Sequence, residues 1–148
     1  MDFQSIELWQ KRLCESDNGR NHLNVNLGVH LEEIGEELME LSFSEPLANE
    51  LLTKAINNIR MVSTLLKLYP HIKVKIKDRE NFLKEICDVI TTGTGVALAA
   101  DMQISKALAE VNSSNWSKFD TDGNPIFTKE GKAARGPNYK PANLRGLV

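Results

Sequence analysis

Two pairs of acidic residues share one spacing along the chain. Glu33 and Glu36 are three residues apart, and so are Glu85 and Asp88. In an α-helix, side chains with this spacing lie on one face, one turn from each other. If two such helices faced each other, four carboxylates would converge, and their repulsion would protonate some of them unless a cation lay between. Carboxylate oxygens suit Mg²⁺ or Mn²⁺, which keep positions open for water and phosphate oxygens.

The first pair also has a simpler interpretation. Between Gly28 and Glu40 the chain has no Lys or Arg but five acids: Glu32, Glu33, Glu36, Glu37 and Glu40. They centre almost opposite the stripe of Leu and Ile residues in the same predicted helix, as on a solvated face. Taken alone, this pair is therefore more typical of a surface than of a metal site.

The second pair has a more specific context. Glu85 and Asp88 lie off the apolar face of their predicted helix, on a stripe of small residues that continues through Thr92, Gly95 and Ala99. Small residues let another backbone or a ligand approach closely. Gly93 and Gly95 each cost about 1 kcal/mol relative to Ala inside a helix. We therefore expect them to serve packing or function.

The elements that position these acids are predicted to be helices. Apolar periodicity and turn signals indicate five, over residues 3–15, 21–41, 47–69, 79–100 and 102–112, the last either separate or continuous with the fourth. Asn18-Gly19 separates the first two, Pro46 suits the first turn of the third, and Asp78 is a good N-cap for the fourth. Between the third and fourth, Ile72, Val74 and Ile76 alternate with lysines, which predicts a short edge strand or an extended connector.

The predicted helix over 47–69 is apolar around much of its circumference. A helix on the outside of a small monomer shows one apolar stripe, so this helix needs two partners. We expect one of them to be a second copy of the chain. The predicted fold class is all-α, a bundle of about five helices with an irregular C-terminal tail that assembles as a homo-oligomer.

The C-terminal part has a different character. After Asn115, turn signals such as Asp122-Gly123, Glu130-Gly131 and Gly136-Pro137 replace the periodicity, and Asp122-Gly123 is also compatible with a hairpin. The tail is rich in Phe, Ile, Tyr and Pro, so we expect residues 116–148 to pack on the helices. A length of 148 residues indicates one domain, 1–148.

The composition excludes several classes. A net charge of -2 is too near neutral for a general nucleic-acid binder. No apolar run approaches the ~18 residues of a membrane span. The first residues, Met1 to Gln4, lack the basic and apolar regions of a signal peptide. These features predict a cytoplasmic protein without nucleic-acid or membrane partners.

Two buried thiols are favoured for Cys14 and Cys87, with a disulfide as the alternative.

Several motifs in order resemble those of one family. Residues 31–38 (LEEIGEEL) and 85–89 (EICDV) resemble the E-E-x-x-E and E-x-x-D motifs of the MazG-like nucleotide pyrophosphohydrolases. The segments at 110–118 (EVNSSNWSK), 122–126 (DGNPI), 131–132 (GK) and 136–139 (GPNY) resemble that family's C-terminal tail. Departures are a longer gap between the acidic motifs, Trp116 in place of a smaller apolar residue, and Ala134-Arg135 in place of an apolar-Lys pair.

The resemblance implies an all-α enzyme that holds Mg²⁺ on Glu33, Glu36, Glu85 and Asp88. It implies attack on the α-phosphorus of a nucleoside triphosphate with release of pyrophosphate, for nucleotide-pool house-cleaning. It also implies a homodimer or a dimer of dimers. Asn115 and Lys118 fall on the Asn and Lys of the tail motif, which makes them candidates for substrate contacts.

The remaining candidate roles follow from side-chain chemistry. Glu36 or Glu37 is the candidate general base for the attacking water. Three basic residues are candidates for binding the outgoing pyrophosphate: Lys118, Lys132 and Arg135. Trp9 and Trp116, with Asn115, are candidates for contacting the base. Solvated tail residues and a core Trp9 are the simpler interpretations.

Two rival interpretations stay open. The chain could instead be a dUTPase or resemble phosphoribosyl-ATP pyrophosphatase, which share the metal site and differ in the base pocket. It could also be a non-catalytic helical oligomer that binds a nucleotide or a protein and uses its acids for solubility. The sequence does not identify the preferred base or sugar.

Overall fold

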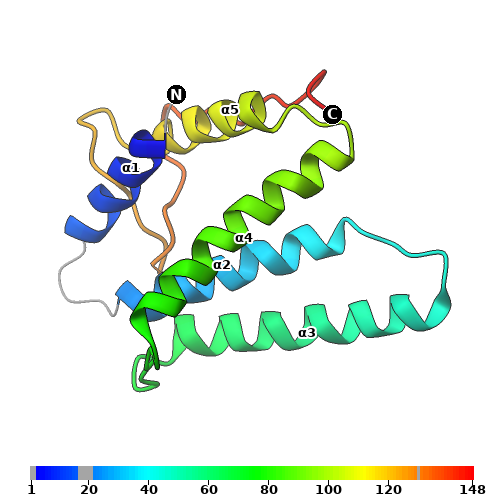
Figure 1. Ribbon diagram of the computed structural model, residues 1–148. Coiled ribbons are helices and arrows are strands. Elements are labelled where there is room, and N and C mark those ends of the chain that lie inside the picture. The colour runs from blue at the N-terminus through cyan, green and yellow to red at the C-terminus, as the bar shows by residue number, and fades with distance from the viewer. Residues whose placement is uncertain (1–2, 17–21, 130) are drawn as a thin grey trace. The chain divides into compact units, whose positions relative to one another are not determined.

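The computed structural model describes residues 3–16, 22–129 and 131–148. Within these ranges the chain forms five helices and no strand (Figure 1). The helices are α1 (Phe3–Glu15), α2 (His22–Met39), α3 (Pro46–Leu68), α4 (Arg79–Ala99) and α5 (Ile104–Trp116). The all-α prediction is therefore confirmed. The expected break at Asn18-Gly19, the expected helix start at Asn21, and Glu130 lie outside the described residues.

Contacts divide the chain into two compact units. The α2–α3 unit comprises Asn18–Val74 and Phe127–Lys132. The α1–α4–α5 unit comprises Met1–Asp17, Lys75–Ile126 and Ala133–Val148. A short piece of the C-terminal tail thus belongs with α2 and α3, while the tail on either side of it belongs with the other helices.

In the α2–α3 unit the two helices lie side by side as a hairpin (Figure 1). Pro46 stands in the first turn of α3, as expected, and the Glu45 carboxylate caps it by accepting from the Ala48 amide at 2.8 Å. The helices meet closely at Gly28, whose carbonyl accepts from the Ser63 hydroxyl at 2.6 Å. An added Cβ at Gly28 would lie 2.7 Å from Lys67 Cγ. Close backbone approach therefore fixes this pair of helices.

The buried residues of α2 are not those of its apolar stripe. The buried residues of α2 are Asn24, Gly28 and Gly35. The expected stripe is only partly covered: Leu27, Leu31, Ile34 and Leu38 are half-buried and Leu41 is exposed. Hydrophobic periodicity finds the bulky side of a helix, whereas the nearest helix approaches where small residues leave room.

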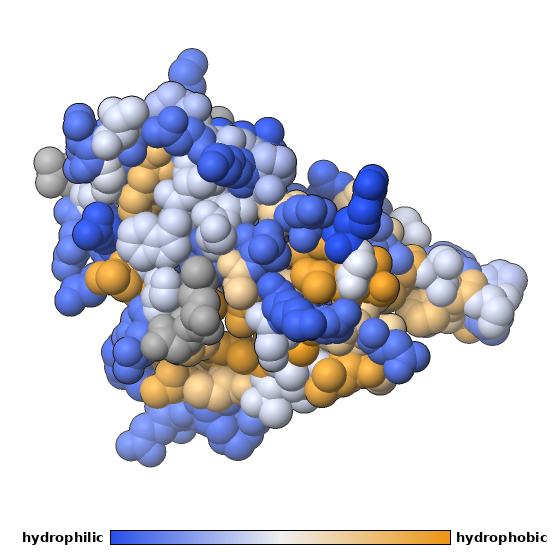
Figure 2. Space-filling model, turned by 90° about the horizontal axis from the view of Figure 1, so that it is seen from above, coloured by the Kyte–Doolittle hydropathy of each residue, from blue (hydrophilic) through white to orange (hydrophobic). Residues whose placement is uncertain are grey.

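α3 has apolar residues beyond its contact with α2, as predicted. Ser63 and Leu66 are buried, yet Leu51, Met61 and Leu68 are each more than half exposed. Apolar residues, in orange, are visible at the surface in several places in Figure 2. A shallow hollow on this helix is lined by Asn57, Arg60, Met61, Thr64, Leu65, Leu68 and Tyr69. One side of α3 thus has its partner, and the other side is open.

The core of the α1–α4–α5 unit is aromatic. Trp9 of α1 and Phe119 after α5 are buried and stack with ring centroids 6.1 Å apart. Trp116 meets Phe119 edge-on at 5.4 Å. The Ser5 hydroxyl accepts from Trp116 Nε1 and Asn112 Nδ2, both at 3.1 Å, and so joins α1 to α5.

The C-terminal tail packs on this core, as expected. An added Cβ at Gly136 would lie 2.5 Å from the carbonyl oxygens of Lys118 and Phe119, so the tail backbone crosses directly over the end of α5. Asp122-Gly123 forms a tight turn with Gly123 at φ 80°, without a strand pair around it in the described chain.

α4 begins as predicted, since the Asp78 carboxylate accepts from the Asn81 amide at 2.9 Å. It has no buried residue, and apart from the nearby backbone of α4 itself no described atom lies within 4 Å of a Cβ added at Gly93 or Gly95. The close approach expected at these glycines is therefore not made by the described chain. α5 is separate from α4 because Asp101, at φ 60°, turns the backbone between them.

Three smaller expectations are also decided. Residues 72–76 form an extended connector rather than an edge strand. Cys14 is half-buried and Cys87 is exposed, and no disulfide joins them, so the expectation of two buried thiols is wrong for Cys87. Its position on the uncovered α4 is the reason. Among the described helices, none is both long and apolar enough to cross a membrane.

Candidate functional site

The first acidic pair lies in the C-terminal half of α2. Glu33 and Glu36 are both exposed, and so is Glu37, the alternative general base. The helix that carries them is fixed by the Gly28–Ser63 contact, so the backbone beneath the pair is firmly placed. The arrangement leaves these carboxylates open to solvent, where they are available to a cation or a water molecule.

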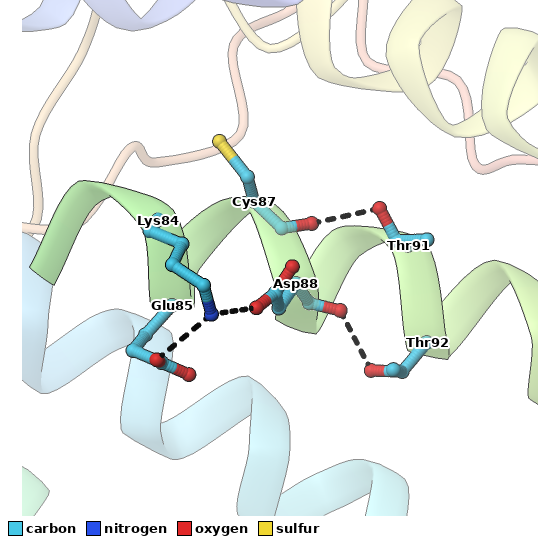
Figure 3. A network of polar contacts seen from close by, with 6 residues as sticks. All are labelled: Lys84, Glu85, Cys87, Asp88, Thr91 and Thr92. Atoms are coloured by element: carbon cyan, nitrogen blue, oxygen red, sulfur yellow. Dashed lines mark hydrogen bonds and ion pairs between the residues drawn. The ribbon is translucent and has the colours of Figure 1, made fainter. Parts of the chain in front are cut away.

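The second acidic pair, on α4, already holds a cation from its own chain. Figure 3 shows the Lys84 ammonium between the two carboxylates, 2.6 Å from Asp88 Oδ2 and 3.2 Å from Glu85 Oε1. Hydrogen bonds to Asp88 and then to Glu85 raise the pKa of Lys84. Two carboxylates that share one ammonium group have the spacing and charge to hold a small cation.

The threonines beside this pair bond to their own helix (Figure 3). Thr92 Oγ1 donates to the Asp88 carbonyl at 2.8 Å, and Thr91 Oγ1 donates to the Cys87 carbonyl at 3.0 Å. Such bonds are usual for threonine inside a helix. The hydroxyl of Thr92 is therefore engaged with the backbone in this structure.

The two acidic pairs belong to different units, so their convergence on one metal ion stays a prediction. Within either unit, the described residues include no group of three or more His, Cys, Asp and Glu side chains placed to hold a metal. Each pair thus supplies half of the predicted ligand set.

The structure brings together four of the predicted substrate-contacting residues around the aromatic core of the α1–α4–α5 unit. Lys118 Nζ donates to Asn115 Oδ1 at 2.8 Å and lies 5.9 Å from the centre of the Trp9 ring. Trp9 Nε1 donates to the Asn115 carbonyl at 3.0 Å. Trp116 is half-buried beside them. Lys118 and Asn115 thus form a polar edge on an aromatic cluster.

The burial of Trp9 agrees with its simpler interpretation as a core residue. Only 7% of Trp9 is exposed, and one ring face is occupied by Phe119. Sequence reasoning missed Arg12, whose guanidinium lies 5.6 Å from the centre of the Trp116 ring and donates to the Gly123 carbonyl at 3.3 Å. Its position one turn after Trp9 on α1 was the available signal.

The two remaining basic candidates, Lys132 and Arg135, lie in different units. The Arg135 guanidinium lies 4.7 Å from the centre of the Tyr139 ring. Lys132 pairs with Glu32, which also pairs with Lys67 of α3. Partial burial raises the pKa of Glu32, but hydrogen bonds from Lys132 and Lys67 outweigh it and hold the pKa below its usual value. No motif of the sequence indicates this cluster, because Lys132 is far from α2 along the chain.

Comparisons with known proteins identify no relative. The chain matches no protein-family model, no curated protein and no solved structure. The motifs of the sequence and the side-chain arrangement of each unit therefore indicate its function.

Proposed function

We propose that this chain is a Mg²⁺-dependent nucleoside triphosphate pyrophosphohydrolase of the MazG-like type. It hydrolyses ribo- or deoxyribonucleoside triphosphates to the monophosphate and pyrophosphate. The observation that carries the proposal is the set of acidic and tail motifs that follow one another in order along the sequence. Two exposed carboxylate pairs of the same spacing, Glu33 with Glu36 and Glu85 with Asp88, support it.

The donor set fits a hard divalent cation. Glu33, Glu36, Glu85 and Asp88 would hold Mg²⁺, and Mn²⁺ is the alternative with the same preference for oxygen. When bound, Mg²⁺ supplies positive charge that offsets the charge of the triphosphate. Lys84 acts as a stand-in for that charge in this structure, since its ammonium group lies where both carboxylates of α4 reach it.

The chain's own residues would carry out proton transfer and phosphate binding. Glu36 or Glu37 accepts a proton from water, whose oxygen bonds to the α-phosphorus as the bond to the bridging oxygen breaks. Lys118, with Lys132 and Arg135, binds the outgoing pyrophosphate. Asn115 and Trp116 border the base, and Trp9 supports them from within the core.

The proposal includes a homodimer or a dimer of dimers. The open side of α3 and the absence of any buried residue on α4 support it, since both helices carry exposed leucines, valines or isoleucines. Apolar surface of this extent is typical of an interface. A cytoplasmic role in removing unwanted nucleotides agrees with the proposed reaction.

A non-catalytic oligomer is the main rival, and one observation favours it. Lys84 already neutralises part of the charge of Glu85 and Asp88, so this pair is stable without a metal. The dUTPase and phosphoribosyl-ATP pyrophosphatase alternatives differ from the proposal only in the substrate.

The test is a screen of standard and modified nucleoside triphosphates with Mg²⁺, in which pyrophosphate and phosphate are measured separately. We expect pyrophosphate release that needs Mg²⁺ and falls at least about 100-fold in Glu36→Gln, a loss typical of a residue that acts directly on the reaction. Glu50→Gln, on the exposed surface of α3, is the matched control. No pyrophosphate from any nucleotide, or full turnover in folded Glu36→Gln, would count against the proposal.

A further inference from the structure

Two lysines converge on one carboxylate oxygen in the α2–α3 unit. Glu32 Oε2 lies 2.5 Å from Lys132 Nζ and 3.0 Å from Lys67 Nζ. The three side chains are partly withdrawn from solvent, with exposed fractions of 25% for Glu32, 12% for Lys67 and 34% for Lys132. Long charged side chains on a surface are rarely so covered.

The position of Lys67 depends on a glycine. Its stem crosses α2 at Gly28, where an added Cβ would come within 2.7 Å of Lys67 Cγ. The Ser63 hydroxyl, bonded to the Gly28 carbonyl, fixes the same crossing. Because the stem is held there, the Lys67 ammonium group is directed to Glu32, one turn further along α2.

A turn of the tail brings Lys132 to the same place. The Thr128 amide donates to the Lys132 carbonyl at 2.8 Å, and the Lys132 amide donates to Thr128 Oγ1 at 3.3 Å. Three segments distant in the sequence, α2, α3 and this turn, thus each contribute one charged group. Such an arrangement is built by the fold and not by local helix geometry.

The cluster carries one positive charge more than it has negative charge. Both ammonium groups bind the same oxygen, so they lie close together and repel each other. One carboxylate offsets only one of them. An anion with several oxygens and more than one negative charge would pair with both lysines at once.

The cluster also lies beside the proposed metal ligands. Glu32 directly precedes Glu33 and lies four residues before Glu36, one turn away on α2. We propose that Lys67 and Lys132 form a subsite for the terminal phosphates of the substrate and for the pyrophosphate product, in which the phosphate group displaces Glu32. Glu32 holds the two lysines in place while the subsite is empty.

This inference rests on the proposed function for its ligand and adds Lys67 and Glu32 to the residues that handle it. Lys67 contacts the phosphates, whereas Glu32 is a positioning residue. The subsite lies wholly within the α2–α3 unit. Its binding of an anion is therefore testable apart from the reaction.

The first experiment measures binding of inorganic pyrophosphate by calorimetry without any metal ion, so that failure of the metal site cannot affect it. We expect Lys67→Met to weaken binding about tenfold, since one charge-assisted hydrogen bond is lost while the stem over Gly28 is kept. Lys132→Met, in the tail turn, should weaken it to a similar extent. Lys54→Met, an exposed lysine of α3, is the control and should bind as the wild type does.

Glu32→Gln gives the distinguishing result. The amide keeps the shape of the carboxylate but leaves two lysines uncompensated, so we expect pyrophosphate to bind several-fold more tightly than to the wild type. Without ligand, we expect the variant to unfold at a lower temperature than the wild type. Added pyrophosphate should raise the melting temperature of the variant by more than it raises that of the wild type. Sulfate at equal concentration should stabilise it less.

The outcomes separate the two proposals. Pyrophosphate binding that is unchanged in Lys67→Met and Lys132→Met, or not tightened in Glu32→Gln, would overturn the subsite even if the wild type hydrolyses nucleotides. The same is true if sulfate binds as well as pyrophosphate. Lysine-dependent pyrophosphate binding in a protein that hydrolyses no nucleotide would leave the subsite in place and reject the enzyme.

Discussion

Two lysine–carboxylate clusters on different helices use the same chemistry in different surroundings. On α4, Lys84 bridges Glu85 and Asp88 with side chains that are all more than half exposed. On α2, Glu32 bridges Lys67 and Lys132 with side chains that are at most about one-third exposed. Exposed ion pairs contribute little to stability because water and salt screen them, whereas covered pairs are costly to break. We therefore expect the α4 cluster to matter for cation binding and the α2 cluster to matter for both the fold and anion binding.

The largest contrast is expected in activity. Asp88→Asn keeps the shape of the side chain but removes its charge, so we expect turnover of a triphosphate with Mg²⁺ to fall about 100-fold or more. The melting temperature should be almost unchanged, because the ion pair that is lost is exposed. A steady-state assay of pyrophosphate release and a thermal melt measure the two effects. Asp122→Asn, at an exposed turn of the tail, is the control. A folded Asp88→Asn enzyme with wild-type turnover would remove Asp88 from the predicted ligands.

The next largest effect is expected on stability, at Gly28, where the stem of Lys67 crosses α2. Gly28→Ala should lower the free energy of unfolding by about 2–3 kcal/mol, because the added methyl group meets Lys67 Cγ at 2.7 Å and the Ser63 carbonyl oxygen at 3.0 Å. Denaturant unfolding measures the change.

A glycine-to-alanine substitution on α4 is the control, and it should change the free energy of unfolding in the opposite direction. Gly93→Ala has no neighbour within 4 Å, and alanine is favoured over glycine inside a helix by about 1 kcal/mol. We therefore expect Gly93→Ala to stabilise the protein. Destabilisation at Gly93 would instead show that a partner approaches there, as expected if this glycine serves packing. Equal effects at both glycines would contradict the contrast between the two helices.

The contrast between these glycines shows what the sequence could and could not reveal. Helix boundaries were predicted well because periodicity, Pro46 and Asp78 act locally. The close contact of α2 with α3 at Gly28 was not predicted, because it depends on the shape of α3 and not on hydrophobicity. Glu32 was grouped with the solvated acids, since its two partners come from distant segments.

The candidate site shows the same division between local and distant information. The sequence alone indicates that Glu85 and Asp88 share one face of a helix. It also indicates that Asn115 and Lys118 lie near one another. Lys84 was overlooked even though it is four residues before Asp88, a distance at which helical side chains pair. The sequence therefore held a signal for Lys84 but none for the meeting of Lys67 and Lys132.

A smaller effect is expected from the charge of Glu32. Its pKa lies below the usual value of 4.5, so the folded state binds fewer protons than the unfolded state in the acid range. This contribution is present above the unfolded pKa and is lost as the pH falls through the folded pKa. At pH 7 we expect Glu32→Gln to cost about 1–2 kcal/mol, reduced from the value for a fully buried pair because the group is partly exposed.

The pH dependence separates charge from shape in that variant. Thermal melts of the wild type and Glu32→Gln should differ at pH 7 and converge as the pH falls through the lowered pKa of Glu32, where the carboxylate of the folded wild type becomes protonated. Glu50→Gln, which removes an exposed pair with Lys54, should show no such convergence because the initial difference is small. A constant difference from pH 7 to pH 3 would mean that the loss comes from packing and not from the ion pairs.

The smallest effect is expected at Lys84. Lys84→Met should leave the free energy of unfolding almost unchanged, because its side chain is 63% exposed and both ion pairs lie in solvent. Mn²⁺ binding, followed by electron paramagnetic resonance, should nevertheless become tighter, since an ion no longer has to displace the ammonium group from Glu85 and Asp88. Lys106→Met, which removes an exposed lysine beside Gln103, is the control. Weaker Mn²⁺ binding in Lys84→Met would mean that the lysine helps to form the cation site instead of competing for it.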